Sequence, residues 1–211
     1  RTIERAALHL LRILDAAITD ASIRLRDITL IDGAELELLS RPYDGPTTFD
    51  ERPVHRLIAA QAQRRAEATA FIFGDLRWTH GELEHRANRL AHRLLALGLA
   101  PEQRVAVALP RSPEAIVAIL AVLKAGGTFV PVDSDHPASR NHHILADAGV
   151  RIVVTSSGRR AKLPEGLNAT LVEIDGAEAD ALPDTDPGVD IDPGQLAYVI
   201  YTSGSTGLPK G

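Results

Sequence analysis

The middle of the chain reads as strand, helix, strand, and this pattern constrains the fold more than any other feature. Val105 to Leu109 is a short apolar run, and Thr128 to Val132 is a second one. Between them, Ser112-Pro113 supplies a helix cap followed by a fixed φ, and Gly126-Gly127 ends the helix. A helix that joins two apolar strands predicts a parallel pair with a right-handed crossover. The sequence therefore predicts an α/β fold built on a parallel βαβ sheet.

Further elements are predicted on both sides of this unit. A long helix should begin after Thr79, because Glu82 follows three residues later and completes a capping box, and Gly98 should end that helix. Gly74-Asp75 is a two-residue turn that predicts a hairpin. The remaining predictions are helices over 1–20, 54–65 and 137–148, hairpin strands over 69–73 and 76–78, and strands over 151–155, 170–174 and 195–201.

Two stretches lack a clear period. Residues 21–50 carry turn chemistry, which predicts a partly packed linker. Between Lys162 and Lys210 there is no basic residue, while aspartates, glutamates and prolines accumulate, which predicts a solvated surface loop. The spacing of these acids does not match a loop that binds hard cations.

Composition narrows the classes of function. The chain has 211 residues, of which 45% are hydrophobic and 24% charged, so a sizeable core is possible. A net charge of −5 without a basic stripe argues against nucleic acid as a partner. No apolar run reaches the about 18 residues of a membrane span and no secretory signal opens the chain, so we expect no membrane partner and a cytoplasmic location. The absence of cysteine excludes disulfides and thiol catalysis, and the absence of methionine indicates an excised or processed segment.

The last eleven residues, Tyr201 to Gly211, have the composition of a phosphate-binding loop. Hydroxyl residues and glycines follow an apolar stretch, and a lysine closes the run. Such a loop offers backbone N–H groups, hydroxyl donors and a cation to a polyphosphate. The spacing does not fit the loop of the nucleoside triphosphatases, because Pro209 precedes Lys210. It does not fit the dinucleotide fingerprint either, because no glycine lies two residues before Gly204.

This run resembles the phosphate-binding signature of the adenylate-forming enzymes, Tyr-Thr-Ser-Gly-Ser-Thr-Gly-x-Pro-Lys-Gly, over its whole length. Leu123 to Asp133 is similar to the Leu-Lys-Ala-Gly-x-x-Tyr-x-Pro-Ile-Asp motif of nonribosomal peptide synthetase adenylation domains. Trp78 to Leu83 resembles the family's Leu-Thr-Tyr-x-Glu-Leu motif, with departures at Trp78 and His80. His136-Pro137 with Arg140 resembles the segment that follows the second motif. The motifs occur in the family's order within residues 54–211.

The resemblance implies a domain organisation. Residues 51–211 would be the N-terminal part of the large subdomain of an adenylation domain, truncated after the phosphate loop. The helix over residues 1–20 would be the C-terminal helix of a condensation-type domain. Residues 21–50 would be the inter-domain linker.

The resemblance also implies ATP-dependent activation of an amino acid to aminoacyl-AMP, followed by loading onto a carrier-protein thiol. The neighbouring condensation and carrier domains would be partners, and the carrier domain downstream would bear phosphopantetheine. The phosphate-binding residues would be Thr202, Ser203, Gly204, Ser205, Thr206, Gly207 and Lys210. None of these is a nucleophile or a general base, so no catalytic residue is predicted. Mg²⁺ would accompany ATP, but its acidic ligand in the family lies downstream, so no metal ligand is predicted here. Because the other functional elements also lie downstream, we expect the 211 residues alone to be inactive.

Two other functions are compatible with the residues. The chain could come from an acyl- or aryl-CoA ligase, although the motif around Lys124 favours a peptide synthetase. It could also be a non-catalytic piece in which residues 1–50 dock domains. A metal site at His85 and His92 is disfavoured, because no carboxylate is arranged between these two histidines.

Overall fold

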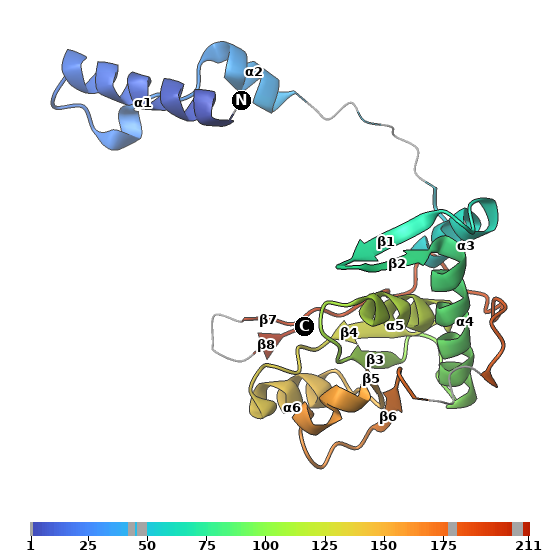
Figure 1. Cartoon of the computed structure of the whole chain (residues 1–211). Helices are drawn as coiled ribbons and strands as arrows, with labels where there is room; N and C mark the ends of the chain where they lie inside the picture. The colour runs from blue at the N-terminus through green and yellow to red at the C-terminus, as the bar shows by residue number, and fades with distance from the viewer. Residues whose placement is uncertain (1, 42–44, 46–49, 177–180, 204–208) are drawn as a thin grey trace. The chain divides into compact units, whose positions relative to one another are not determined.

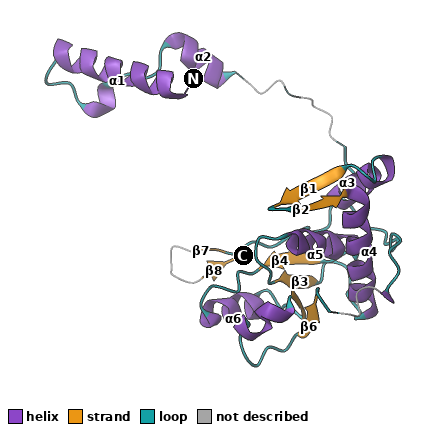
Figure 2. Cartoon of the chain, viewed as in Figure 1, coloured by secondary structure: helices purple, strands orange, loops and turns teal. Residues whose placement is uncertain are grey.

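The computed structural model describes residues 2–41, 45, 50–176, 181–203 and 209–211. The chain divides into two compact units, Arg1–Asp50 and Glu51–Gly211. The first unit contains two α-helices, and the second contains the sheet with its helices (Figures 1 and 2).

The first unit consists of α1 (Thr2–Thr19), a 3₁₀ turn (Leu25–Asp27) and α2 (Gly33–Ser40). Helix α1 confirms the helix predicted over residues 1–20. Helix α2 was not predicted, since it lies within the stretch interpreted as a linker. The carboxylate of Asp32 accepts a hydrogen bond of 2.8 Å from the backbone N of Glu35 and so caps α2. Across the described residues, no helix has both the length and the apolar character needed to cross a membrane.

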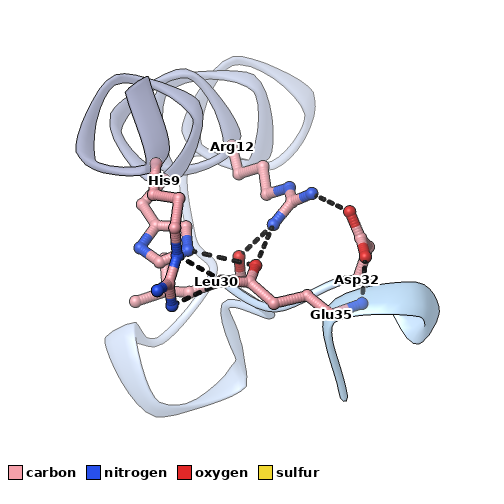
Figure 3. Close-up of polar contacts among 6 residues, drawn as sticks. His9, Arg12, Leu30, Asp32 and Glu35 are labelled. Carbon is pink, nitrogen blue, oxygen red and sulfur yellow. Dashed lines mark hydrogen bonds and ion pairs between the residues drawn. The ribbon is translucent and has the colours of Figure 1, made fainter. Parts of the chain in front are cut away.

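Polar contacts join α1 to the segment that contains α2 (Figure 3). The guanidinium of Arg12 donates to the backbone carbonyl of Leu30 and to the carboxylate of Asp32. Glu35 lies 2.7 Å from Nη2 of Arg5 and 3.4 Å from Nε2 of His9. None of the described residues of this unit is buried. The unit is therefore held by polar contacts that remain open to water.

The second unit begins with α3 (Val54–Arg64) and the antiparallel hairpin of β1 (Thr69–Phe73) and β2 (Leu76–Thr79). Helix α4 (His80–Ala96) follows directly. Thr79 and Glu82 form both hydrogen bonds of the predicted capping box. Gly74 in the hairpin turn and Gly98 after α4 both have positive φ, which suits glycine. The hairpin, the capping box and the stop after α4 were all predicted correctly.

A parallel sheet forms the centre of this unit, with strand order β4-β3-β5-β6. Its strands are β3 (Arg104–Val107), β4 (Thr128–Pro131), β5 (Ile152–Thr155) and β6 (Thr170–Glu173), and its neighbouring helices are α5 (Pro113–Lys124), α6 (Ala138–Asp147) and the 3₁₀ turn Ser157–Lys162. The register pairs Val105 with Phe129 and with Ile152. The predicted parallel βαβ unit is therefore confirmed.

Alternate residues of the strands face opposite sides of the sheet, as the period of a strand requires. Val105 and Val107 pack with α4 and α5 in one apolar cluster, whereas Ala106 and Val153 pack with α6 in another. Figure 1 shows α5 and α6 on opposite sides of the strands. The sheet is covered on both faces, which is why its strands read as continuous apolar runs.

The strand predicted over residues 195–201 is wrong. The segment forms a single parallel bridge, between Tyr198 and Phe129. The amide of Phe129 donates to Ala197 and its carbonyl accepts from Val199. The next donor on β4 would be Pro131, which has no N–H, so the ladder cannot continue. Leu196, Tyr198 and Ile200 are exposed along this segment, whereas Val130 on β4 and Val105 on β3 are fully buried.

The stretch rich in acidic residues over 175–192, called the acidic tract from here on, also differs from the prediction at one place. Asp184 and Asp186 do not form a freely solvated loop, because they contact the helices. Nδ2 of Asn88 donates to the carbonyl of Asp184 at 2.7 Å, and Nη1 of Arg56 donates to the carboxylate of Asp186 at 3.0 Å. The basic and amide side chains of α3 and α4 thus bind this part of the tract.

Candidate functional site

The predicted phosphate-binding residues fall at the C-terminal end of the second unit. Thr202 and Ser203 form β7 (Thr202–Ser203), and Lys210 belongs to β8 (Pro209–Lys210). The two strands are antiparallel, and Thr202 is the direct partner of Lys210. Both of these residues are exposed. The structure therefore brings one hydroxyl and the cation to the same position, and both face solvent.

Four of the predicted residues, Gly204, Ser205, Thr206 and Gly207, lie outside the described residues.

The segment before β7 is held against β4 along its length. The hydroxyl of Thr128 donates to the carbonyl of Leu196 at 2.9 Å, and the amide of Leu196 donates to the carboxylate of Glu102 at 2.8 Å. The segment runs parallel to β4, so the chain advances toward the carboxyl ends of the strands before it enters β7. In open α/β sheets, ligands bind beyond the carboxyl ends of the strands.

Helix α6 contacts the chain on both sides of the segment 204–208. The hydroxyl of Tyr201 donates to the carboxylate of Asp147 at 2.5 Å. Nε2 of His143 lies 3.2 Å from the carbonyl of Pro209, and because a carbonyl only accepts, this nitrogen must carry the proton. Burial, followed by the contact with Asp147, raises the pKa of Tyr201 to about 12. Neither contact was predicted from the sequence, although the spacing of four residues between His143 and Asp147 places them on one helix face.

Gly211 lies against the ring of Tyr201. A Cβ atom at Gly211 would lie 2.7 Å from Cε2 of Tyr201 and 2.9 Å from Cγ1 of Val199. These separations are far below van der Waals contact, so any side chain at position 211 would displace the ring or the chain end. The final glycine of the motif is thus required by packing against the tyrosine at its start.

Lys124, the lysine of the motif over residues 123–133, is buried and forms an ion pair inside the second unit. Lys124 ends α5, and its side chain is only 1% exposed. Its Nζ lies 2.6 Å from Oε1 of Glu84 on α4 and 3.9 Å from the carboxylate of Asp186. Gly127 follows, where a Cβ would lie 3.0 Å from Cδ2 of Leu99. This motif therefore joins α4, α5 and the acidic tract by packing and by a buried ion pair.

His55 on α3 lies in the same environment. Its ring is 3% exposed. Burial, and then the positive charges of Arg56 and Lys124, lower the pKa of His55 to about 4, although Asp186 acts in the opposite direction. His55 is therefore neutral at pH 7.

A metal site is not formed by the described residues. Over this part of the chain, no group of three or more histidine, aspartate or glutamate side chains is placed to hold an ion. His85 and His92, which the sequence places seven residues apart, both contact the acidic tract. Nδ1 of His85 lies 3.4 Å from the carboxylate of Asp184, and Nε2 of His92 lies 3.0 Å from the carbonyl of Thr185.

Comparison with known proteins gives consistent matches. A family model described as AMP-binding enzyme matches residues 58–211. Phosphinothricin tripeptide synthetase PhsB of Streptomyces viridochromogenes is 40% identical over 213 residues, a match that covers 96% of this chain and 18% of the synthetase. Tyrocidine synthase 2 of Brevibacillus parabrevis is 39% identical over 216 residues, covering 100% of this chain and 6% of that protein. The chain thus spans less than a fifth of the length of either synthetase.

Solved structures agree with these relatives. The AMPPNP-bound form of the nonribosomal peptide synthetase FmoA3 superimposes with a TM-score of 0.73 at 25% identity, covering 95% of this chain and 22% of that one. The N-terminal subdomain of NpsA from Klebsiella oxytoca superimposes with a TM-score of 0.64 at 28% identity, covering 74% of this chain and 40% of that one. The parallel sheet and its helices therefore have the α/β fold of these structures, as the sequence predicted.

Proposed function

This chain belongs to the AMP-binding enzyme family, as part of a nonribosomal peptide synthetase adenylation domain, and from this premise we propose that its parent enzyme activates an amino acid with ATP. The amino-acid carboxylate would attack the α-phosphate, giving aminoacyl-AMP and pyrophosphate. The acyl group would then pass to the phosphopantetheine thiol of a carrier domain, releasing AMP. ATP and the acceptor domain would place the reaction in the cytoplasm.

The observation that carries this proposal is the pairing of Thr202 with Lys210, both of which are exposed. Thr202 and Ser203, with Ser205 and Thr206, would supply hydroxyl donors to the β- and γ-phosphates. Gly204 and Gly207 would let backbone N–H groups approach the phosphate oxygens, because they have no Cβ. Lys210 would stabilise the negative charge that develops on the leaving pyrophosphate.

Magnesium would reach the site bound to the triphosphate. The described residues offer no cluster of carboxylates that fits the ion. We therefore assign no residue of this chain to magnesium and no step to it.

The first unit would belong to the domain boundary of the synthetase. We assign residues 1–20 to the last helix of a condensation-type domain and residues 21–50 to the linker. Supporting this, the alignments with the synthetases extend over 96% and 100% of the chain, and so include this unit. Apolar side chains exposed on α1, among them Leu10, Leu11 and Leu14, would be covered by the rest of the condensation domain.

Amino-acid-dependent ATP–pyrophosphate exchange by the synthetase that contains this chain tests the role of the loop. We expect Lys210→Ala to lower kcat/KM for ATP by about 10- to 100-fold, the effect of losing a hydrogen bond to a charged group. Lys210→Arg should retain more activity than Lys210→Ala, because it keeps the charge. Lys162→Ala is the matched control, since this exposed lysine pairs with Asp135. Equal activity of Lys210→Ala and Lys162→Ala would refute the assignment.

We further propose that the 211 residues alone do not catalyse the adenylation of an amino acid. They cover 40% of the NpsA N-terminal subdomain, so most of the surface around the nucleotide would be missing. The same exchange assay on the isolated chain checks this, and amino-acid-dependent turnover would contradict it.

A further inference from the structure

The two short strands around residues 204–208 have a common support on α6. Asp147 accepts from the hydroxyl of Tyr201, which precedes β7, and His143 donates to the carbonyl of Pro209, which begins β8. His143 and Asp147 are four residues apart, so both project from one face of the helix. One helix face thus holds the chain on both sides of the loop.

The side chains that make these contacts are themselves packed against the second unit. The side chain of Pro209 is buried, and that of His143 is half-buried. Tyr201 packs with Val199 against the apolar cluster under α6. Gly211 then lies against the ring of Tyr201, which adds a third contact between the two sides of the loop. The positions of β7 and β8 are therefore determined by α6 as well as by their own pairing.

We propose that His143 and Asp147 are positioning residues that hold β7 and β8 in register, so that Thr202 and Lys210 are already adjacent when a polyphosphate arrives. The inference rests on the proposed function, because it assumes that the loop binds ATP. Neither residue is assigned a contact with the nucleotide. Because these contacts already hold β7 and β8 in place, less conformational entropy is lost when the ligand binds, and the affinity for the ligand is higher.

The first test measures hydrogen exchange in the 211-residue chain without any nucleotide. The variants are His143→Ala, Asp147→Ala and Tyr201→Phe. Each removes one hydrogen bond, so we expect the amides of residues 202, 203, 210 and 211 to exchange about 3- to 10-fold faster. Amides of β3 and β5 should be unchanged, which distinguishes local release from unfolding.

Matched controls lie next to each position. His142→Ala removes an exposed ring from the same helix, and Tyr198→Phe removes a hydroxyl from an exposed ring of the same segment. Neither control should alter exchange at residues 202, 203, 210 and 211. His143→Gln restores a donor and should recover part of the protection lost in His143→Ala. Unchanged exchange in all three test variants, or equal acceleration in the controls, would overturn the inference.

The second test uses ATP–pyrophosphate exchange by the synthetase that contains the chain. We expect His143→Ala and Asp147→Ala to raise KM for ATP by about 3- to 10-fold and to leave KM for the amino acid unchanged. If Lys210→Ala impairs ATP use while these two variants do not, the loop assignment stands and the positioning role is wrong. If Lys210→Ala has no effect, the loop assignment fails, and the hydrogen-exchange result still decides whether α6 holds the strands.

Discussion

The two compact units of this chain contain helices of the same kind but hold them in different ways. Helices α1 and α4 are both long, and each has leucines at helical spacing. On α4, Leu83, Leu90 and Leu94 are buried against the sheet and α5. On α1, Leu10, Leu11 and Leu14 are exposed. The same sequence pattern therefore indicates a helix in both places, but only the neighbouring elements decide whether its apolar face is covered.

The polar contacts of the two units differ in the same manner. Arg5 and Glu35 pair at a surface, where an ion pair contributes about 0–1 kcal/mol. Lys124 and Glu84 pair in the interior of the second unit, where the loss of one partner leaves an uncompensated charge. We therefore expect equivalent substitutions in the two units to have unequal effects on stability.

The largest effect is expected from the buried ion pair. Lys124→Met leaves Glu84 charged with only 13% of its side chain exposed, and should lower the free energy of unfolding of the second unit by about 3–5 kcal/mol. Trp78 is the only tryptophan of the chain, so its fluorescence during urea unfolding reports on this unit.

Two variants sharpen this measurement. Glu84→Gln combined with Lys124→Met removes both charges and should recover part of the loss. Arg5→Ala, the corresponding change at the surface of the first unit, should change the free energy of unfolding of that unit by less than about 1 kcal/mol, which circular dichroism follows because Trp78 lies in the second unit. A Lys124→Met protein with the urea midpoint of the wild type would show that the interior of this unit tolerates the lone carboxylate.

A leucine on each helix gives the next comparison. Leu94 on α4 is fully buried, so Leu94→Ala should lower the free energy of unfolding by about 2–5 kcal/mol through lost burial and the cavity left behind. Leu10 on α1 is 57% exposed, and Leu10→Ala should change the free energy of unfolding by less than about 0.5 kcal/mol. Thermal unfolding followed by circular dichroism measures both. A loss of similar size in the two variants would mean that the apolar face of α1 is covered.

How much the sequence predicted depends on whether the signal was local. Caps, turn glycines and apolar runs are local, and they predicted α4, α5 and the parallel strands correctly. Helix α2 also has a local signal, because Asp32 precedes Glu35 by three residues, but the few residues that follow do not show a helical period. The strand predicted over 195–201 failed because its partner has a proline at position 131, and which strands pair is not visible in the segment itself.

The candidate site follows the same rule. The phosphate-binding residues were predicted from one continuous motif and stay a prediction. The pairing of Thr202 with Lys210 is what two strands joined by a short connection favour. The contacts of His143 and Asp147 cross more than 50 residues of sequence, so no local pattern indicates them. The burial of Lys124 is likewise a tertiary effect, since its motif reads only as the end of a helix.

The two units should lose stability in different pH ranges as the solution is acidified. The pKa of His55 is lowered to about 4 in the folded state, against about 6.5 when unfolded, so His55 stabilises the second unit fully above pH 6.5. As pH falls from 6.5 to 4 the unfolded state takes up the proton first, and about 3 kcal/mol is lost. In the first unit, the pKa of Asp32 is lowered by the amide of Glu35 and by Arg12, so its contribution is lost only below its ordinary value of 3.8.

Urea unfolding of the second unit, followed by Trp78 fluorescence between pH 7 and 4, measures the contribution of His55 to the free energy of unfolding. His55→Leu should remove the dependence in this window, whereas His142→Ala, which replaces an exposed histidine, should not. If the free energy of unfolding of His55→Leu still falls with pH as it does in the wild type, other groups cause the acid sensitivity.

The smallest effect, and the most direct comparison, comes from the two helix caps. Asp32 caps α2 and Thr79 caps α4, each by accepting from a backbone N–H three residues later. Replacing either by alanine removes a bond that contributes about 1 kcal/mol. Helix α2 has eight residues and no buried side chain, so this loss should release its amides to exchange. Helix α4 packs against α5 and the sheet, so amides 83–96 should stay protected after Thr79→Ala, and only the amide of Glu82 loses its acceptor. Asp32→Asn keeps a good cap without the charge and should keep most of the protection, which separates the cap from the ion pair with Arg12. If α2 and α4 respond equally, tertiary packing is not what distinguishes the two units.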